Sequence, residues 1–243
     1  MKIYKYRKLS LGDEEAFARL ERIVRHRLLW CARPDTLNDP LEFAWTCDFK
    51  ESPATMDLLA KLLEEVKRRP PSLARQIALD VVRVGRLGEI AAPVIQDLIQ
   101  RSRDEIGIVC FGTAPDNEVL WGRYGGDGAG VCVEFTVPDS LCKTQLHQVV
   151  YNDQRQLHVD EFLRSRNEPS SAVGVYATLL TKTKFWEPEG EVRFISKRQE
   201  VEVALDGSEV TQVIVGPKTH PHVEVRVRRL SGTIPVVRLE TTA

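Results

Sequence analysis

The chain of 243 residues has little of what marks several protein classes. Its five cysteines show no Cys-x-x-Cys spacing, so neither a zinc site nor a disulfide framework is indicated. Its five histidines include no metal-binding pair at helical spacing. No apolar stretch approaches bilayer-spanning length, and the N-terminus lacks the apolar core of a signal peptide. We therefore expect a cytoplasmic protein with no resident metal and no membrane contact.

Excess charge of one sign is also missing. The chain carries 34 basic and 35 acidic residues, a formal net charge of -1, so it offers no broad electrostatic footprint for DNA or an anionic membrane. Glycines cluster at 125–130, but without the G-x-G-x-x-G register, and they precede an expected strand rather than a helix. A nucleotide-binding loop is therefore unsupported there, and a turn with positive φ angles is the simpler interpretation.

What the chain does have is enough apolar material for a core, with 42% hydrophobic residues. Apolar periodicity predicts one α+β domain over residues 1–243, with a central, mainly antiparallel β core and a helical insertion at 52–105. Helices are expected at 13–29, 154–166 and 172–180. Strands are expected at 3–6, 28–31, 106–111, 130–135, 145–151, 189–195, 201–205, 210–215, 223–228 and 234–239.

The segment from Lys184 to Ile195 is the most informative stretch. It places Glu189, Glu191 and Arg193 at every second position of an expected strand, so that all three share one face. Two carboxylates and a guanidinium in a row are a candidate catalytic site. A solvated, salt-bridged outer face of a strand has the same pattern, and the segment alone leaves both interpretations open.

Several spaced blocks resemble a bacterial family catalogued as domain of unknown function 2971. They are residues 4–7 (YKYR), 34–42 (PDTLNDPLE), 110–111 (CF), 120–124 (LWGRY), 130–135 (GVCVEF), 150–151 (VY) and 186–193 (WEPEGEVR). The order of the expected elements is also similar, more distantly, to the ADP-ribosyltransferase fold, including toxin branches that modify nucleic acids. The resemblance to the family of unknown function covers nearly the full chain outside the helical insertion.

The resemblance to ADP-ribosyltransferases implies an enzyme that consumes NAD as a substrate, in the setting of a toxin or a phage-defence effector. Glu191 would stabilise the oxocarbenium-like centre as nicotinamide leaves, and Glu189 would activate the acceptor, for which nucleic acid, protein and water all stay open. Arg193 would hold Glu191 ionised or neutralise the strand.

The same resemblance implies the residues that bind the dinucleotide. Arg7 or Lys5 of the first strand would hold it, although strand alternation does not decide between Arg7 and Tyr6. Trp121 and Tyr124 would stack on its rings, and Arg193 would add a positive charge. Because residues three apart share a helix face, we predict that both Trp121 and Tyr124 line the site rather than fill the core.

Two other classes of function stay open from the residues. Asp39, Glu42, Glu189 and Glu191 could supply oxygen ligands to Mg²⁺ in a phosphodiesterase or nuclease. Alternatively, the same charges serve a partner surface in a non-catalytic binding module. The Asn38-Asp39-Pro40 sequence is a turn former, so this loop is either structural or lies at the mouth of a site.

Overall fold

The computed structural model describes residues 1–39, 46–48, 53–154, 156–158 and 175–240. Contacts divide the chain into two compact units. The first, here the sheet unit, comprises 1–33, 106–149 and 184–243; the second, the helical unit, comprises 34–105 and 150–183. Every candidate residue except Asp39 and Glu42 belongs to the sheet unit.

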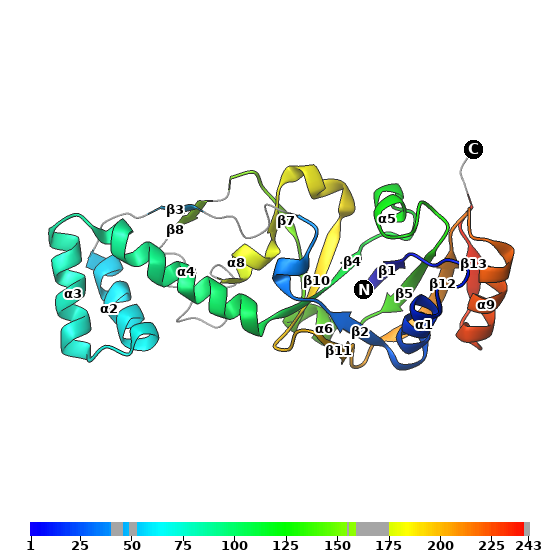
Figure 1. The fold of residues 1–243 in the computed structure, drawn as a ribbon, viewed down its shortest axis with the longest axis horizontal. Coiled ribbons are helices and arrows are strands. Elements are labelled where there is room, and N and C mark those ends of the chain that lie inside the picture. Colours follow the sequence, from blue (N-terminus) through cyan, green and yellow to red (C-terminus); the bar gives the residue numbers. More distant parts are fainter. Residues whose placement is uncertain (40–45, 49–52, 155, 159–174, 241–243) are drawn as a thin grey trace. The chain divides into compact units, whose positions relative to one another are not determined.

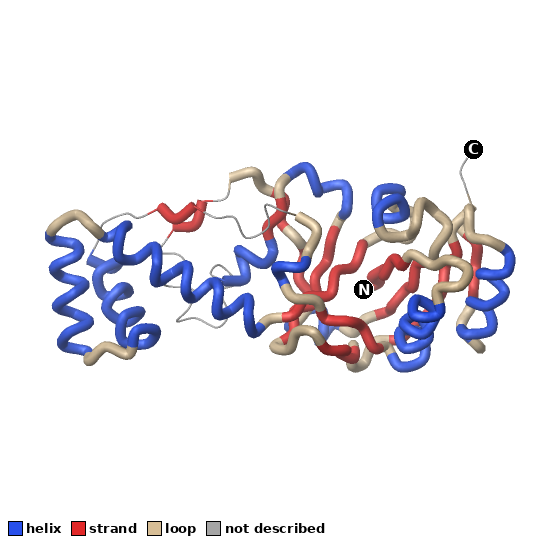
Figure 2. Tube along the Cα trace, viewed as in Figure 1, coloured by secondary structure: helices blue, strands red, loops and turns tan. Residues whose placement is uncertain are grey.

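A seven-stranded sheet organises the sheet unit (Figures 1 and 2). Its order is β13-β12-β5-β1-β4-β10-β6, and each pairing is antiparallel except that of β12 with β13. The strands are β1 (Lys2–Arg7), β4 (Gly107–Gly112), β5 (Val131–Thr136), β6 (Leu146–Gln148), β10 (Glu191–Ser196), β12 (Glu209–Val215) and β13 (Val236–Arg238).

Short helices and a two-stranded ribbon complete the sheet unit. The helices are α1 (Glu14–His26), α5 (Glu118–Arg123), α6 (Asp139–Thr144), α9 (Pro221–Ser231) and the 3-10 helix η2 (Lys184–Glu189). The ribbon pairs β2 (Leu28–Cys31) with β11 (Val201–Ala204). Asp13 caps α1 by accepting a hydrogen bond from Ala16 N, and Arg27 ends the helix in the left-handed conformation.

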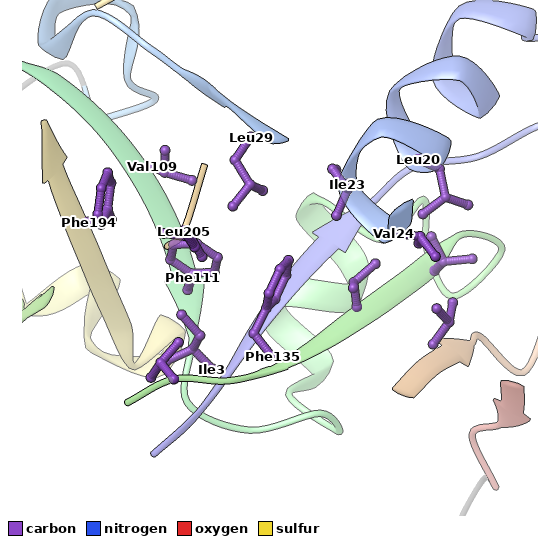
Figure 3. Packing of buried hydrophobic residues seen from close by; sticks show 14 of the residues in the cluster. Ile3, Leu20, Ile23, Val24, Leu29, Val109, Phe111, Phe135, Phe194 and Leu205 are labelled. Carbon is purple, nitrogen blue, oxygen red and sulfur yellow. The ribbon is translucent and has the colours of Figure 1, made fainter. Parts of the chain in front are cut away.

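The main core lies on the sheet face that α1 and α9 cover. Strand alternation sends Ile3, Phe111, Phe135 and Phe194 to this face, where they pack with Leu20, Ile23 and Val24 of α1 (Figure 3). The apolar stripe of α1 thus meets the apolar side of the sheet. Burying each of these large side chains stabilises the fold by about 1.5–3 kcal/mol.

A smaller aromatic cluster lies on the opposite face, against α5. Tyr4 and Tyr6 of β1 pack there with Leu120 and Trp121 of α5, together with Cys132 and Ile214. The rings of Tyr6 and Trp121 meet edge to face with centroids 5.3 Å apart. Successive residues of β1 therefore serve two different cores, one on each face of the sheet.

The helical unit contains α2 (Pro53–Lys67), α3 (Pro71–Arg83), α4 (Leu87–Glu105), α8 (Val175–Leu180) and the 3-10 helix η1 (Pro34–Thr36). Two short parallel pairings complete it: β3 (Thr46–Asp48) with β8 (Gln156–His158), and β7 (Val150–Tyr151) with β9 (Thr181–Lys182). Residues 53–105 hold helices and no strand. Among the described residues, no helix is long and apolar enough to cross a membrane.

The α+β class and the mainly antiparallel central sheet are confirmed. Residues 223–228, predicted as a strand, instead lie in α9. Their valines suggested a strand, but Val223 and Val227 are buried at helical spacing, and Pro221 at the helix start after the His220 cap favours a helix. Residues 156–158, predicted as helix, form β8, and 159–166 lie outside the described residues. A single domain over 1–243 stays a prediction.

Candidate carboxylate site

Glu189 and Glu191 lie on either side of a tight turn, not on one strand as predicted. Glu189 ends η2, Gly190 turns the chain with φ of +53°, and Glu191 begins β10. Both carboxylate residues are buried, with exposures of 1% and 5%. Because a buried carboxylate is costly without partners, each must be matched by donors or cations.

Helix α5 supplies two donors to Glu189. The Arg123 Nη1 and Tyr124 hydroxyl groups donate to Glu189 Oε1 at 2.9 and 3.1 Å. Asn117 fixes this helix, because its Oδ1 accepts from Leu120 N as the N-cap while its Nδ2 donates to Pro188 O at 2.7 Å. One asparagine thus starts α5 and joins it to the turn that carries Glu189.

Arg123 also stacks on two aromatic rings of η2. Its guanidinium carbon lies 4.2 Å from the ring centroid of Trp186 and 5.6 Å from that of Phe185. Trp186 is half-buried, whereas Phe185 is 72% exposed. The Glu189 ion pair therefore borders an exposed surface that combines a cation with aromatic faces.

Glu191 pairs with Arg193 on the same strand face. Arg193 Nε donates to Glu191 Oε1 at 2.7 Å, and Arg193 has no exposed surface. Sheet register places Cys110 of β4 and His147 of β6 directly opposite Arg193, so all three side chains share this face. Of the expected row, only Glu191 and Arg193 share a strand face; they are buried, and Cys110 and His147 extend this polar row across three strands.

Burial shifts the titration of the neighbouring groups. Burial, and then the charge of Glu189, raise the pKa of Tyr124. Burial raises the pKa of the Cys110 thiol, and nearby Glu191 adds to the effect. Burial lowers the pKa of His147. Tyr124 therefore stays a hydroxyl donor to Glu189 at neutral pH, and Cys110 is a thiol rather than a nucleophilic thiolate.

The prediction that both aromatic rings line the site is wrong for Trp121. Trp121 is 5% exposed, packs within the aromatic cluster, and donates from Nε1 to Pro115 O at 2.9 Å. A buried indole needs such an acceptor, and this one belongs to the loop before α5. Tyr124 is half-buried and does reach Glu189. Tyr6 is buried beside Trp121, and its hydroxyl donates to Ala114 O.

Lys5 and Arg7 lie on the other face of the sheet. Lys5 pairs with Val133 and Arg7 with Val131, whose side chains are part of the main core. Lys5 Nζ donates to Cys110 O at 2.7 Å and lies 5.6 Å from the Phe111 ring centroid. The structure thus brings Glu189, Glu191, Arg193, Tyr124 and Tyr6 to one face. Lys5 and Arg7 extend from the other face of β1, although the negative charge of Glu191 still acts on the Lys5 ammonium group.

Lys5 makes a pH-dependent contribution to stability that we predict will be measurable. Burial, and then the charge of Arg7, lower the pKa of Lys5 to about 8. In the unfolded chain the value is about 10.4, so between those pH values the unfolded state binds more protons. The destabilising contribution of Lys5 is therefore complete below about pH 8 and disappears as the pH rises to about 10.4.

In a Lys5→Met variant, this gain in stability between about pH 8 and pH 10.4 should be absent. Its free energy of unfolding should fall more steeply than that of the wild type, by up to about 1.4 kcal/mol per pH unit across this range. Urea unfolding at several pH values measures the difference. Parallel stability curves for the two proteins would contradict the prediction. Comparing the two proteins cancels the common effect of the buried thiols, which acts in the opposite direction.

Sequence patterns missed Arg123, Cys110 and His147. Arg123 lies next to Tyr124 in sequence, but no local pattern shows that α5 faces η2 and brings Arg123 to Glu189. Among the described residues, no group of three or more histidine, cysteine, aspartate or glutamate side chains could hold a metal ion. Asp39 is buried in the helical unit, and Glu42 lies outside the described residues.

Comparison of the chain with protein-family models, with curated proteins and with solved structures finds no match.

Proposed function

We propose that this chain is an ADP-ribosyltransferase-like enzyme that consumes NAD at the Glu189–Glu191 site. The observation that carries the proposal is the pair of buried carboxylates, two residues apart, each held by its own guanidinium and one by the Tyr124 hydroxyl. A toxin or phage-defence role belongs to the same proposal and rests on the resemblance alone.

The proposed reaction transfers ADP-ribose from NAD to an acceptor. The bond from the ribose anomeric carbon to the nicotinamide nitrogen breaks, and its electron pair leaves with nicotinamide. Positive charge then develops at the sugar, and Glu191, which is negative and already oriented by Arg193, stabilises this transition state more than the bound substrate. An acceptor oxygen or nitrogen attacks the same carbon, and Glu189 takes the acceptor's proton.

The dinucleotide needs a cation for its diphosphate and a flat surface for its rings. Arg123 and Trp186 provide both beside Glu189, and the half-buried Tyr124 lies at the inner end of the same group. These three residues take the binding role in this proposal, because Lys5 and Arg7 face the other side of the sheet and Trp121 is committed to packing.

The alternatives have less support from the described residues. A metal-dependent phosphodiesterase or nuclease needs several carboxylates close together. In the described part of the chain, no three histidine, cysteine, aspartate or glutamate side chains lie where they could hold a metal ion. The hypothesis of a non-catalytic binding module agrees with the exposed Phe185. It does not explain why two carboxylates are buried beside that surface. The enzyme proposal uses both features.

Nicotinamide release from NAD tests the proposal. Purified protein should release nicotinamide when single-stranded nucleic acid or protein is supplied as acceptor. An Arg123→Met variant should lower kcat/KM about 10–100-fold, because a charged hydrogen bond to substrate is worth about 1.5–3 kcal/mol. Arg229→Met, an exposed change on α9, is the matched control and should leave turnover unchanged. Failure of the wild-type protein to release nicotinamide with any acceptor would reject the proposal.

A further inference from the structure

Asn117 joins two elements that the proposed site needs together. One is α5, a helix of six residues that carries Arg123, and the other is η2, which carries Trp186 and Glu189. A helix this short has little stability of its own, because isolated helices below about 12–15 residues are marginal in water. The position of α5 beside η2 therefore depends on side chains that reach from one element to the other.

The Asn117 amide uses both of its ends. Its Oδ1 accepts from Leu120 N at 3.1 Å, and its Nδ2 donates to Pro188 O at 2.7 Å, with Glu189 O farther away at 3.5 Å. Aspartate, serine and threonine also occupy N-caps, but an aspartate carboxylate has no donor, and a hydroxyl lies one bond closer to the backbone. Among these capping residues, asparagine is the one that can start α5 and also hold η2.

This joint differs from the other bonds between the two elements. Arg123 and Tyr124 both donate to the Glu189 carboxylate, so the strength of their bonds depends on its charge. In the proposed reaction Glu189 takes a proton from the acceptor, and the neutral acid holds the guanidinium less tightly. Asn117 donates instead to the backbone carbonyl of Pro188, which gains no proton. The Asn117 bond therefore persists at the step where the ion pair weakens.

The proposed dinucleotide surface spans the same two elements. Its cation, Arg123, follows α5, and its aromatic face, Trp186, follows η2, with the guanidinium carbon 4.2 Å from the ring centroid. Glu191 lies instead on β10, where Arg193 orients it. Loss of the joint should therefore disturb the binding of NAD while leaving the stabilisation of the developing cation in place.

We propose that Asn117 is a positioning residue, whose amide holds α5 against η2 throughout turnover. It thereby keeps Arg123, Trp186 and Glu189 in one arrangement, and it acts through these residues rather than through contact with the substrate. This inference rests on the proposed function, because it gives Asn117 a task in that reaction.

Two substitutions separate the joint from the cap. Asn117→Ser and Asn117→Asp both keep an N-cap oxygen for Leu120 N and lose the amide group that donates to Pro188 O, and only the second adds a charge. Each should raise the KM for NAD about 3–10-fold, the net value of one hydrogen bond, with nicotinamide release at saturating NAD nearly unchanged. Asn117→Ala loses the cap as well and should unfold about 2–4 °C below Asn117→Ser.

A second measurement needs no activity. Fluorine NMR of protein labelled with fluorinated tryptophan reports on the Trp186 ring, whose resonance is assigned through Trp186→Phe. Asn117→Ser and Asn117→Asp should both shift this resonance, because Arg123 no longer stacks on the ring in one position. Asp13→Ala is the matched control, since it removes the side chain that caps α1 by accepting from Ala16 N. It should leave the Trp186 resonance and the KM for NAD unchanged.

A Trp186 resonance at its wild-type position in Asn117→Ser would overturn the proposal. An unchanged KM for NAD would do the same, and so would a fall in the rate at saturating NAD without a rise in KM, because the chemical step would then depend on Asn117. If the wild-type protein releases no nicotinamide, the proposed function fails, and the fluorine spectra still decide whether Asn117 holds α5 against η2.

Discussion

Replacement of Glu191 by glutamine should lower the rate of nicotinamide release about a hundredfold to ten-thousandfold. The change preserves the size and shape of the side chain and removes the charge that faces the developing cation. Because Glu191 is buried beside a fully buried guanidinium, its field acts in a poorly screened environment, where loss of charge has its greatest effect. The measurement is a single-turnover assay of nicotinamide at saturating NAD.

Three comparisons give this result its meaning. Glu187→Gln makes the same chemical change two residues before Glu189, at an exposed position of η2, and should leave the rate unchanged. Glu191→Asp keeps the charge and should retain more activity than the glutamine variant. Glu189→Gln should lower transfer to an acceptor more than it lowers hydrolysis, because Glu189 is proposed to take the acceptor's proton. Equal rates for wild type and Glu191→Gln would reject the mechanism.

Strand alternation predicted the carboxylate site only in part. The alternation of Glu191 and Arg193 with Val192 and Phe194 is enough to give one polar and one apolar face, and the structure confirms both. The same rule at β1 separates Tyr6 from Lys5 and Arg7. Alternation does not show which face of β1 lies on the same side of the sheet as Glu191, because that depends on how β1 pairs with β4 and β5.

Long-range contacts and local turns were beyond the sequence patterns. Arg123 meets Glu189 across 66 positions of the chain, and no local signal marks that contact. Gly190 breaks the expected strand because its positive φ turns the chain between the two glutamates. Trp121 lies in α5 and Tyr124 caps its C-terminus, but the indole is buried by packing against β1 and by its hydrogen bond to Pro115 O, which no local pattern shows. In α9, the valines favour a strand, but His220 and Pro221 start a helix, and its buried side includes Val223 and Val227.

Arg193 should be the residue of this site on which folding depends most. Arg193→Met keeps a long side chain but leaves the Glu191 carboxylate buried without its guanidinium. Breaking a buried ion pair from one side costs about 3–5 kcal/mol, because the remaining buried charge loses its guanidinium and gains no water in exchange. Urea unfolding should therefore show a markedly lower midpoint for Arg193→Met. The exposed control Arg229→Met should change the free energy of unfolding by about 0.5 kcal/mol or less.

A double-mutant cycle separates this explanation from a simple loss of packing. If the single variants are unstable because each leaves an unmatched charge, the Glu191→Gln/Arg193→Met protein should lose less stability than the sum of the two losses. The coupling should amount to about 1–3 kcal/mol, the range found for residues in direct contact. Strict additivity would mean that Arg193 stabilises the sheet by its packing alone. Arg193 would then have no electrostatic hold on Glu191, and the proposed orientation of that carboxylate would lose its basis.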